Sequence, residues 1–214
     1  MELVNVYNLE DPRVAQPMLR EEFYNEQIEH YKKNNKPSKA VEVVHILLFN
    51  KHKQIVLQKR SRTKNHNPGL IDKAVGGHIT FGNSPFYTLI VETVQELRVP
   101  SIVLYNKEDF SKTYSLLNSY LDNIAIVQYF DTHLFESERV INKELVKIAN
   151  KSHLFLGVYG GATQPIDQEA SGVLYYSLSE LRAEMAERPD NFTGDIKYLL
   201  LKYATDIDQF LAQI

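Results

Sequence analysis

The sequence has no cysteine, no long apolar run and no excess of positive charge, and each absence narrows its chemistry. Without cysteine the chain cannot form a disulfide, use a thiolate nucleophile or bind zinc through thiolates, which agrees with a reducing cytoplasm. No apolar segment approaches the roughly 18–20 residues that cross a bilayer, and no basic leader precedes an apolar block. The formal net charge of −3 argues against a general nucleic-acid-binding protein. We therefore expect a cytoplasmic protein that acts on neither membranes nor nucleic acid.

Local patterns divide the chain into a short N-terminal part and a main domain. Residues 1–18 show little periodicity and contain two prolines, so we expect an extended arm. Apolar residues at helical spacing predict a short helix over 19–31, and the polar run that follows predicts a linker. The sequence therefore predicts an N-terminal arm and helix, residues 1–39, in front of a main domain, residues 40–214.

Strands and helices alternate along the main domain, which favours an α/β sandwich. Branched apolar residues predict a hairpin of two strands over 41–50 and 54–61. Further strands are expected near 124–134, 153–161 and 172–178, and helices near 108–121 and 178–187. After Thr193 a continuous apolar stripe predicts one long C-terminal helix. Residues 101–152 give the weakest pattern and are treated as an insert.

One predicted helix carries the most informative pair of side chains. Ser84 followed by Pro85 is a good N-cap and first helical position, and Pro100 disfavours helix at the residue before it. Within this helix Glu92 and Glu96 are four residues apart and point the same way. Like charges at this spacing cost roughly 0.2–0.5 kcal/mol, whereas Mg²⁺ takes one or two carboxylates together with phosphate oxygens.

Spacing alone leaves two interpretations of this helix open. It is either a surface helix with two solvated glutamates or one wall of a metal site. A glycine turn at Gly76 and Gly77 would let backbone groups approach a ligand closely. Gln95 adds a neutral amide oxygen beside the two carboxylates.

From Leu57 to Val99 the chain resembles the Nudix family, whose signature is G-x5-E-x7-R-E-U-x-E-E-x-G-U, with U a bulky apolar residue. Aligned on Gly77, the residues Glu92 and Glu96 match two of its glutamates. The segment LQKRSRTKNHNPGLIDKAVGGH looks like the strand and loop that precede the signature in Nudix members related to isopentenyl-diphosphate isomerase. PIDQEASGVLYYSLSELRAEMAERPDNFT resembles the family's late loop, strand and capped helix. The resemblance implies the Nudix α/β/α sandwich with a mixed sheet, here with an N-terminal helical extension.

The signature is incomplete in this chain. Asn83 and Val91 stand where the family has a Glu and an Arg that commonly form an ion pair and orient the catalytic glutamates. Gln95 replaces another glutamate, which removes a negative charge and keeps an oxygen, and Arg98 replaces the last Gly. Joint loss of an ion pair is compatible with a stable fold. The loss of this ion pair does not show whether the orientation of Glu92 is preserved.

The resemblance implies a Mg²⁺-dependent hydrolase, with Mn²⁺ as an alternative metal, that cleaves a nucleoside-diphosphate-linked or related diphosphate molecule. Water activated by the metal would attack a phosphorus atom. The implied metal ligands are Gly77, Glu92, Gln95 and Glu96. Glu96 is the main ligand in this hypothesis, and Glu92 is a second ligand or the general base. In several members the base comes from a late loop, so Glu169 or Asp167 is an alternative.

Basic residues gather between residues 51 and 64, which predicts either a phosphate-facing edge or a solvated end of the hairpin. Arg60 and Lys64 are the best candidates for substrate binding, because the resembling segment in relatives keeps a basic residue at both positions. His78 stands where the isomerases have a metal-ligand histidine, and it is either a ligand-binding residue or a polar cover on the turn. We include it among the candidate substrate-binding residues.

A second interpretation is a catalytically weak or inactive Nudix module that binds a nucleotide or a protein partner. The substitutions at Asn83, Val91 and Gln95 support it directly. Isoprenoid isomerisation relies on a cysteine at the position of Gly76 and on a metal-ligand histidine near Val41, and this chain has neither. The N-terminal arm and helix are compatible with a homodimer, which is common in the family.

Overall fold

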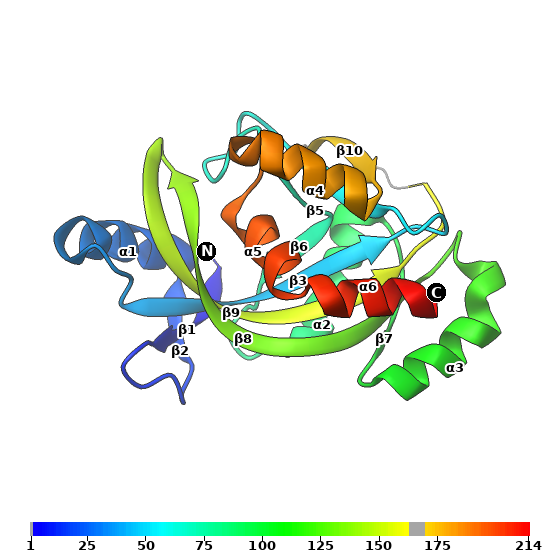
Figure 1. Cartoon of the computed structure of the whole chain (residues 1–214). Coiled ribbons are helices and arrows are strands. Elements are labelled where there is room, and N and C mark those ends of the chain that lie inside the picture. Colours follow the sequence, from blue (N-terminus) through cyan, green and yellow to red (C-terminus); the bar gives the residue numbers. More distant parts are fainter. Residues whose placement is uncertain (1, 163–169) are drawn as a thin grey trace.

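The computed structural model, which describes residues 2–162 and 170–214, is built around the central strand β3 (Lys39–Phe49) (Figure 1). Every residue of β3 after the first is buried, as expected for a branched, apolar strand covered on both faces. One edge of β3 pairs in parallel with β9 (Glu144–Val158). The other edge pairs antiparallel with β1 (Leu3–Asn8), β6 (Val75–His78) and β4 (Ile55–Arg60) in turn.

The remaining strands extend this sheet on both sides. β4 also pairs with β5 (Ile71–Lys73) and with β10 (Ala170–Tyr176), and β2 (Gln16–Leu19) pairs with β1. β8 (Ala125–Ile141) runs antiparallel to β9 in a long curved hairpin and parallel to β7 (Ser101–Leu104) (Figure 1). Because the β3–β9 and β7–β8 pairs are parallel and the others antiparallel, the sheet is mixed.

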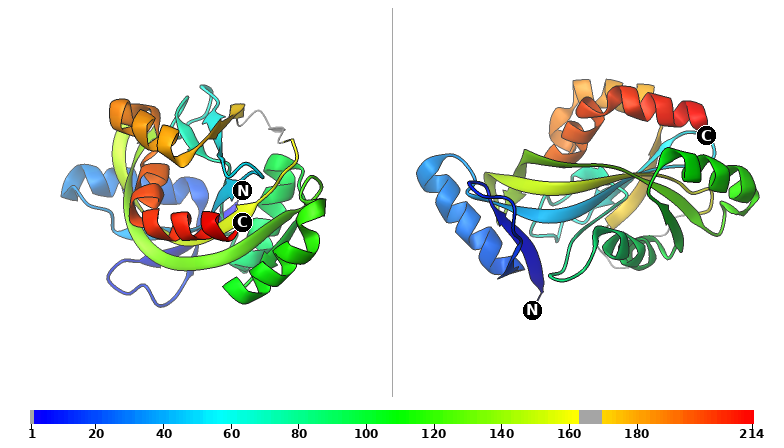
Figure 2. Two further views of the ribbon diagram at one scale, coloured as in Figure 1. Left: turned by 45° about the vertical axis from the view of Figure 1, so that its right-hand side comes forward. Right: turned by 90° about the horizontal axis from the view of Figure 1, so that it is seen from below.

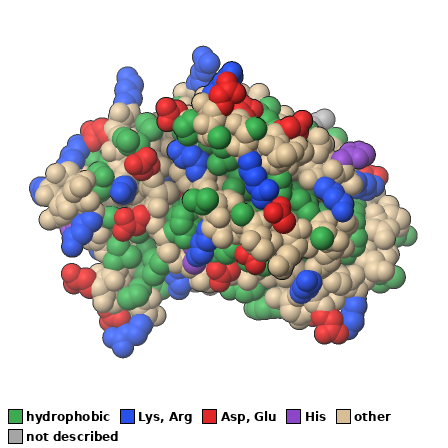
Figure 3. Space-filling view, in the orientation of Figure 1, with side chains coloured by type: hydrophobic (Ala, Val, Ile, Leu, Met, Phe, Trp, Pro, Cys, Tyr) green, Lys and Arg blue, Asp and Glu red, His purple; other side chains and the backbone are tan. Residues whose placement is uncertain are grey.

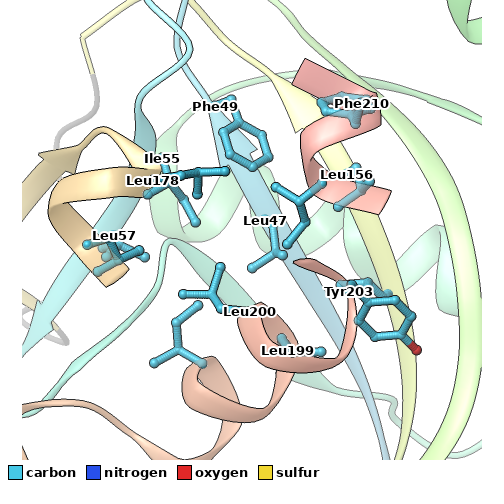
Figure 4. Close-up of a cluster of buried hydrophobic side chains, with 14 of the residues drawn as sticks. Leu47, Phe49, Ile55, Leu57, Leu156, Leu178, Leu199, Leu200, Tyr203 and Phe210 are labelled. Carbon is cyan, nitrogen blue, oxygen red and sulfur yellow. The ribbon is translucent and has the colours of Figure 1, made fainter. Parts of the chain in front are cut away.

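Helices pack on both faces of the sheet (Figure 2). One face carries α3 (Lys107–Leu117), α4 (Leu178–Glu187), α5 (Gly194–Lys202) and α6 (Ala204–Gln213), with short 3-10 turns at Asn118–Tyr120 and Pro189–Asn191. Leu47 and Phe49 of β3 meet Leu199 and Phe210 in the core below these helices (Figure 4). The other face carries α2 (Pro85–Leu97), and α1 (Arg20–Asn34) packs with β1 in a third core.

Several local predictions are confirmed. The hairpin of β3 and β4 forms, and the side chain of Ser84 caps α2 by accepting a hydrogen bond from the Tyr87 amide. Ser177 and Glu180 form a complete capping box at α4. No helix in the described ranges is long and apolar enough to cross a membrane. On the face shown in Figure 3, acidic and basic side chains are interspersed rather than gathered by sign.

The prediction of an N-terminal helical extension is wrong, because the chain begins with strands. β1 pairs with β2 and β3, and its four central residues, Val4 to Tyr7, are all buried. A strand that is buried on both faces does not alternate apolar and polar residues, so residues 1–18 gave no recognisable period. The helix follows at α1, somewhat longer than expected.

The last helix and the insert also differ from the predictions. The apolar stripe after Thr193 spans two helices, α5 and α6, which meet at Tyr203. The Tyr203 hydroxyl is 2.6 Å from Asp131 Oδ2 and 2.7 Å from His133 Nδ1, and these bonds hold the bend against β8. β8 and β9 are longer than expected, at 17 and 15 residues.

Candidate active site

α2 brings Glu92 and Glu96 to one side of the helix. Ser84 caps the helix, and Leu89, Thr93 and Leu97 are buried against the sheet. The two glutamates are half-buried beside this buried stripe. Their carboxylates therefore face inward from the edge of the helix and line a cleft rather than the outer surface.

Gly77 lies directly beside the carboxylate of Glu92. The predicted glycine turn is wrong here, because Gly76 and Gly77 belong to β6 and pair with β3. The turn comes later, where the Asn83 amide donates to the Thr80 carbonyl. Neither glycine of β6 has a positive φ, and the physical reason for Gly77 is space: a Cβ there would overlap the side chain of Glu92.

A cleft of about 290 Å³ collects most of the predicted site residues. Its lining includes Gly77, His78, Glu92, Gln95, Glu96 and Arg60. Lys64 lies in an adjoining cleft instead. Glu169 and Asp167 lie outside the residues that the structure describes.

A buried charged network lines the same cleft, and it was not predicted. Asp195, which is 3% exposed at the start of α5, accepts hydrogen bonds from Arg139 Nη2 at 3.0 Å and Ser137 Oγ at 2.5 Å. Lys73 Nζ lies 3.4 Å from Asp195 Oδ2 and 3.2 Å from Asp72 Oδ1. The network therefore connects β5, β8 and α5 beneath the cleft.

The electrostatics of this network favour an anionic ligand. Burial acts to raise the pKa of Asp72 and of Asp195, but the neighbouring cations outweigh it, and both pKa values lie below the usual range. Arg60 Nη1 lies 3.4 Å from Asp72 and adds a third cation to Lys73 and Arg139. Three cations against two carboxylates leave one net positive charge, which suits a phosphate group.

A second, wider cleft of about 780 Å³ adjoins the first. The two share Glu2, Arg20, Arg60 and His66, and Lys64 lines only the wider one. Burial and four neighbouring cations lower the pKa of His66 to about 3. His66 is therefore neutral at neutral pH where the two clefts meet.

His78 forms a hydrogen bond with a residue of the N-terminal segment. Its Nε2 lies 2.7 Å from the hydroxyl of Tyr24 in α1. Burial, followed by Arg20 and Arg139, holds the pKa of His78 well below its usual value. With Nε2 engaged in this bond, that nitrogen is not available to a metal, so the geometry does not favour the ligand role suggested by the isomerases.

Residues 83, 91 and 95, which are charged in the signature, are all neutral here, so neither member of the signature's ion pair is left without the other. Asn83 is exposed in the turn before α2, and Val91 is half-buried on the helix. Glu92 packs against Gly77 without the ion pair that the signature would supply.

The donor set of the cleft fits magnesium better than a softer metal. Glu92 and Glu96 offer carboxylate oxygens, and Gln95 offers an amide oxygen, in a cleft that also holds Gly77. Among the described residues no group of three His, Asp or Glu side chains is placed to hold a metal alone. Mg²⁺ usually takes one or two carboxylates and completes its shell with water and substrate phosphates. The donors therefore fit a magnesium ion that binds together with a diphosphate.

Sequence reasoning missed much of the cleft lining. The missed side chains include Arg20, His66, Lys73, Arg139 and Asp195, which come from five separate segments. A local signal existed only for Lys73, which stands with Asp72 inside the apolar stretch GLIDKAV. Charged residues inside such a stretch indicate a buried ion pair, because unpaired charges are rarely buried.

Comparisons with known proteins place this geometry in context. No family model matches the sequence. The isopentenyl-diphosphate Delta-isomerase of Streptomyces coelicolor is 24% identical over 159 residues, which is 74% of this chain and 66% of the isomerase, slightly under two thirds of its length. The crystal structure of DR0079 from Deinococcus radiodurans has a TM-score of 0.62 and 16% identity, over 94% of this chain and 98% of that one. A Nudix-family hydrolase structure from Clostridium perfringens has a TM-score of 0.48 and 15% identity, over 79% of this chain and 97% of that one.

The likeness to DR0079 extends over nearly the whole chain and shows a shared α/β fold with a mixed, curled sheet. The likeness to the isomerase is one of sequence, and it agrees with the resemblance of the segment before the glycines. The chain therefore shares its fold with DR0079 and is a distant sequence relative of the isopentenyl-diphosphate Delta-isomerase, which agrees with the resemblance to the Nudix family seen in its sequence.

Proposed function

We propose that the protein is a Mg²⁺-dependent hydrolase of small diphosphate compounds, with nucleoside-diphosphate-linked molecules as the first class to test. One observation carries the proposal. The two carboxylates of α2 share a cleft with a buried network of net positive charge. A metal ion and a diphosphate require these two kinds of group side by side.

Arg60 is the residue best placed to bind the diphosphate. Its Nε donates to the His66 carbonyl at 3.1 Å, and its Nη1 lies 3.4 Å from Asp72, so the guanidinium is held in place. It belongs to both clefts. We assign Arg60 to the phosphates and Lys64 to the part of the substrate that extends into the wider cleft.

Glu92, Gln95, Glu96 and the Gly77 carbonyl would hold the metal, which when bound lowers the pKa of water and neutralises charge on the phosphates. When a water oxygen attacks phosphorus, the new P–O bond forms as the phosphoanhydride P–O bond breaks, and the leaving phosphate departs as an anion. The proton of the water passes to a carboxylate of the chain. Glu92 is the candidate base in the described cleft, and Glu169 remains a candidate outside the described residues. Arg60 and the buried cations stabilise negative charge that develops on the phosphate oxygens.

A product-release screen tests this function directly. Nucleotide sugars, dinucleoside polyphosphates, oxidised nucleotides and coenzyme A are each incubated with Mg²⁺ or Mn²⁺. Glu96→Gln should lower turnover of the best substrate by about 100-fold or more, because it removes a charged metal ligand. Glu187→Gln, at an exposed glutamate of α4, is the matched control and should be silent. Equal turnover of Glu96→Gln and wild type would remove Glu96 from the mechanism.

A catalytically weak module that binds a nucleotide or a protein partner is the second candidate. The neutral residues Asn83, Val91 and Gln95, at positions that are charged in the signature, favour it. Calorimetry separates the two candidates. Ligand binding with no product after long incubation with metal would support the binding module over the hydrolase.

A further inference from the structure

Three hydrogen bonds connect α5 to His78 by way of β8 and α1. Asp195 Oδ2 accepts from Arg139 Nη2 at 3.0 Å, Arg139 Nη1 donates to the Tyr24 hydroxyl at 2.7 Å, and that hydroxyl lies 2.7 Å from His78 Nε2. Arg139 is 8% exposed and Tyr24 is 4% exposed. The path is therefore buried along its length and ends at the candidate active-site cleft.

The chemistry of the donors and acceptors limits the direction of donation along this path. A guanidinium only donates hydrogen bonds, so the Tyr24 oxygen accepts the bond from Arg139. Among the described residues, His78 Nε2 is then the acceptor within reach of the remaining hydroxyl proton of Tyr24. Donation from Nε2–H to the second lone pair of the phenol oxygen would leave that proton without an acceptor, so the favoured arrangement has Nε2 unprotonated. The ring proton consequently resides on Nδ1 of His78.

His78 follows Gly77 in β6 and lines the cleft that holds Glu92 and Glu96. Within the described part of the chain, Nδ1 of His78 forms no hydrogen bond. We propose that His78 donates a hydrogen bond through Nδ1–H to a phosphate oxygen of the bound diphosphate, and that Tyr24 and Arg139 are positioning residues that hold the ring in this tautomer. The nature of the ligand rests on the proposed function.

This inference gives the N-terminal segment a role in the site. Tyr24 comes from α1, and the same helix supplies Arg20 to the cleft. The segment in front of the central strand is thus a wall of the phosphate site. A neutral donor is also well suited to this place, because it binds phosphate without adding a cation that would repel the metal ion.

The tautomer can be measured without any enzymatic activity. Long-range ¹H–¹⁵N NMR of the ¹⁵N-labelled protein distinguishes a protonated from an unprotonated imidazole nitrogen, and the His78→Asn spectrum assigns the His78 signals. We expect Nδ1 to be protonated in the wild type, and Tyr24→Phe to produce a mixture of tautomers. Tyr7→Phe is the matched control, since Tyr7 is also buried and its hydroxyl bonds Glu42 at 3.1 Å. A wild-type ring protonated on Nε2 would overturn the assignment.

Binding of inorganic pyrophosphate with Mg²⁺ tests the donor role. A hydrogen bond to a charged group contributes roughly 1.5–3 kcal/mol, so His78→Ala should weaken the affinity by about 10-fold or more. His78→Asn, whose amide restores a donor near the Nδ1 position, should recover part of the loss, and Tyr7→Phe should be unchanged. Affinity that is equal in His78→Ala and wild type would overturn the donor role.

Different results would refute the hydrolase function and the donor role of His78. Weaker pyrophosphate binding by His78→Ala, in a protein that hydrolyses no diphosphate, would support the donor role and refute the hydrolase. Hydrolysis that is fully retained in His78→Ala, with unchanged KM, would refute the donor role alone.

Discussion

Replacing Gly77 with alanine puts a methyl group where the structure holds the side chain of Glu92. The overlapped atoms are the end of a flexible side chain rather than backbone, so Glu92 can turn away at a cost of about 0.5–1.5 kcal/mol. Alanine is more favourable than glycine inside a strand by roughly 0.5–1 kcal/mol. Because these two effects oppose each other, the free energy of unfolding should change by less than about 1 kcal/mol.

The same substitution should have a large effect on the chemistry. A catalytic group displaced by an ångström can cost about 100-fold in rate, so Gly77→Ala should lower turnover of the best screened diphosphate by about that factor. The affinity for Mn²⁺, measured by electron paramagnetic resonance, should fall as well, because Glu92 is a proposed ligand. Urea denaturation measures the stability of the same protein sample.

Gly172 provides the matched control, because it also lies in a strand, β10, and a Cβ there would meet no atom within 4 Å. Gly172→Ala should keep the wild-type turnover and be equally or slightly more stable. Wild-type turnover and Mn²⁺ affinity in Gly77→Ala would refute a role for Glu92 at its present position. A loss of stability above about 3 kcal/mol would refute the argument that the side chain of Glu92 can turn away from the new methyl group at little cost.

Three further substitutions test other parts of the molecule. Arg98 ends α2 with a φ of 55°, a backbone conformation that costs a non-glycine residue about 1–2 kcal/mol. Arg98→Gly should therefore raise the free energy of unfolding, measured by urea titration, by about 0.5–1 kcal/mol, and a lower free energy of unfolding would contradict this. Burial acts to raise the pKa of Glu42, but hydrogen bonds from His153 and Asn5 outweigh it and bring the pKa to about 2. The stabilisation by Glu42 is thus present above its ordinary pKa of 4.5 and lost as the pH falls towards 2, so the stability gap between wild type and Glu42→Gln should shrink by about 2–3 kcal/mol between pH 5 and pH 2; parallel pH profiles would refute it. Gln95→Glu adds a charge to the proposed metal site and should raise Mn²⁺ affinity by about 10-fold, and an unchanged affinity would remove residue 95 from the ligand set.

Local signals in the sequence were sufficient for elements that begin and end at clear caps. Ser84 and Pro85 located α2, and the capping box located α4. The hairpin of β8 and β9 was harder to predict because its turn consists of Asn142 and Lys143, both with positive φ. A two-residue turn of this kind is usually recognised by a glycine, and Asn-Lys does not give that signal.

The candidate site, too, has a part that local sequence signals could predict and a part that they could not. Spacing along one helix found Glu92 and Glu96, because four residues make one turn. The bonds of the buried network join residues far apart in the sequence: Lys73 and Asp195 are 122 residues apart, and Arg139 and Asp195 are 56 apart. No periodic pattern encodes such contacts, so the cations beneath the cleft could be identified only from the folded chain.

The missing charges of the signature have a consequence for the order of binding. Of the three positions that are charged in the full signature and neutral here, only residue 95 lines the cleft, and Gln95 there leaves the cleft with one negative charge fewer than the signature would give. That weakens a divalent cation bound alone and reduces repulsion toward a diphosphate. We therefore expect pyrophosphate to raise the affinity for Mn²⁺ strongly, and Mn²⁺ to raise the affinity for pyrophosphate by the same factor, since coupling between two ligands is reciprocal. Calorimetry in both orders measures this factor, and independent binding of the two ligands would show that the carboxylates and the buried cations do not form one site.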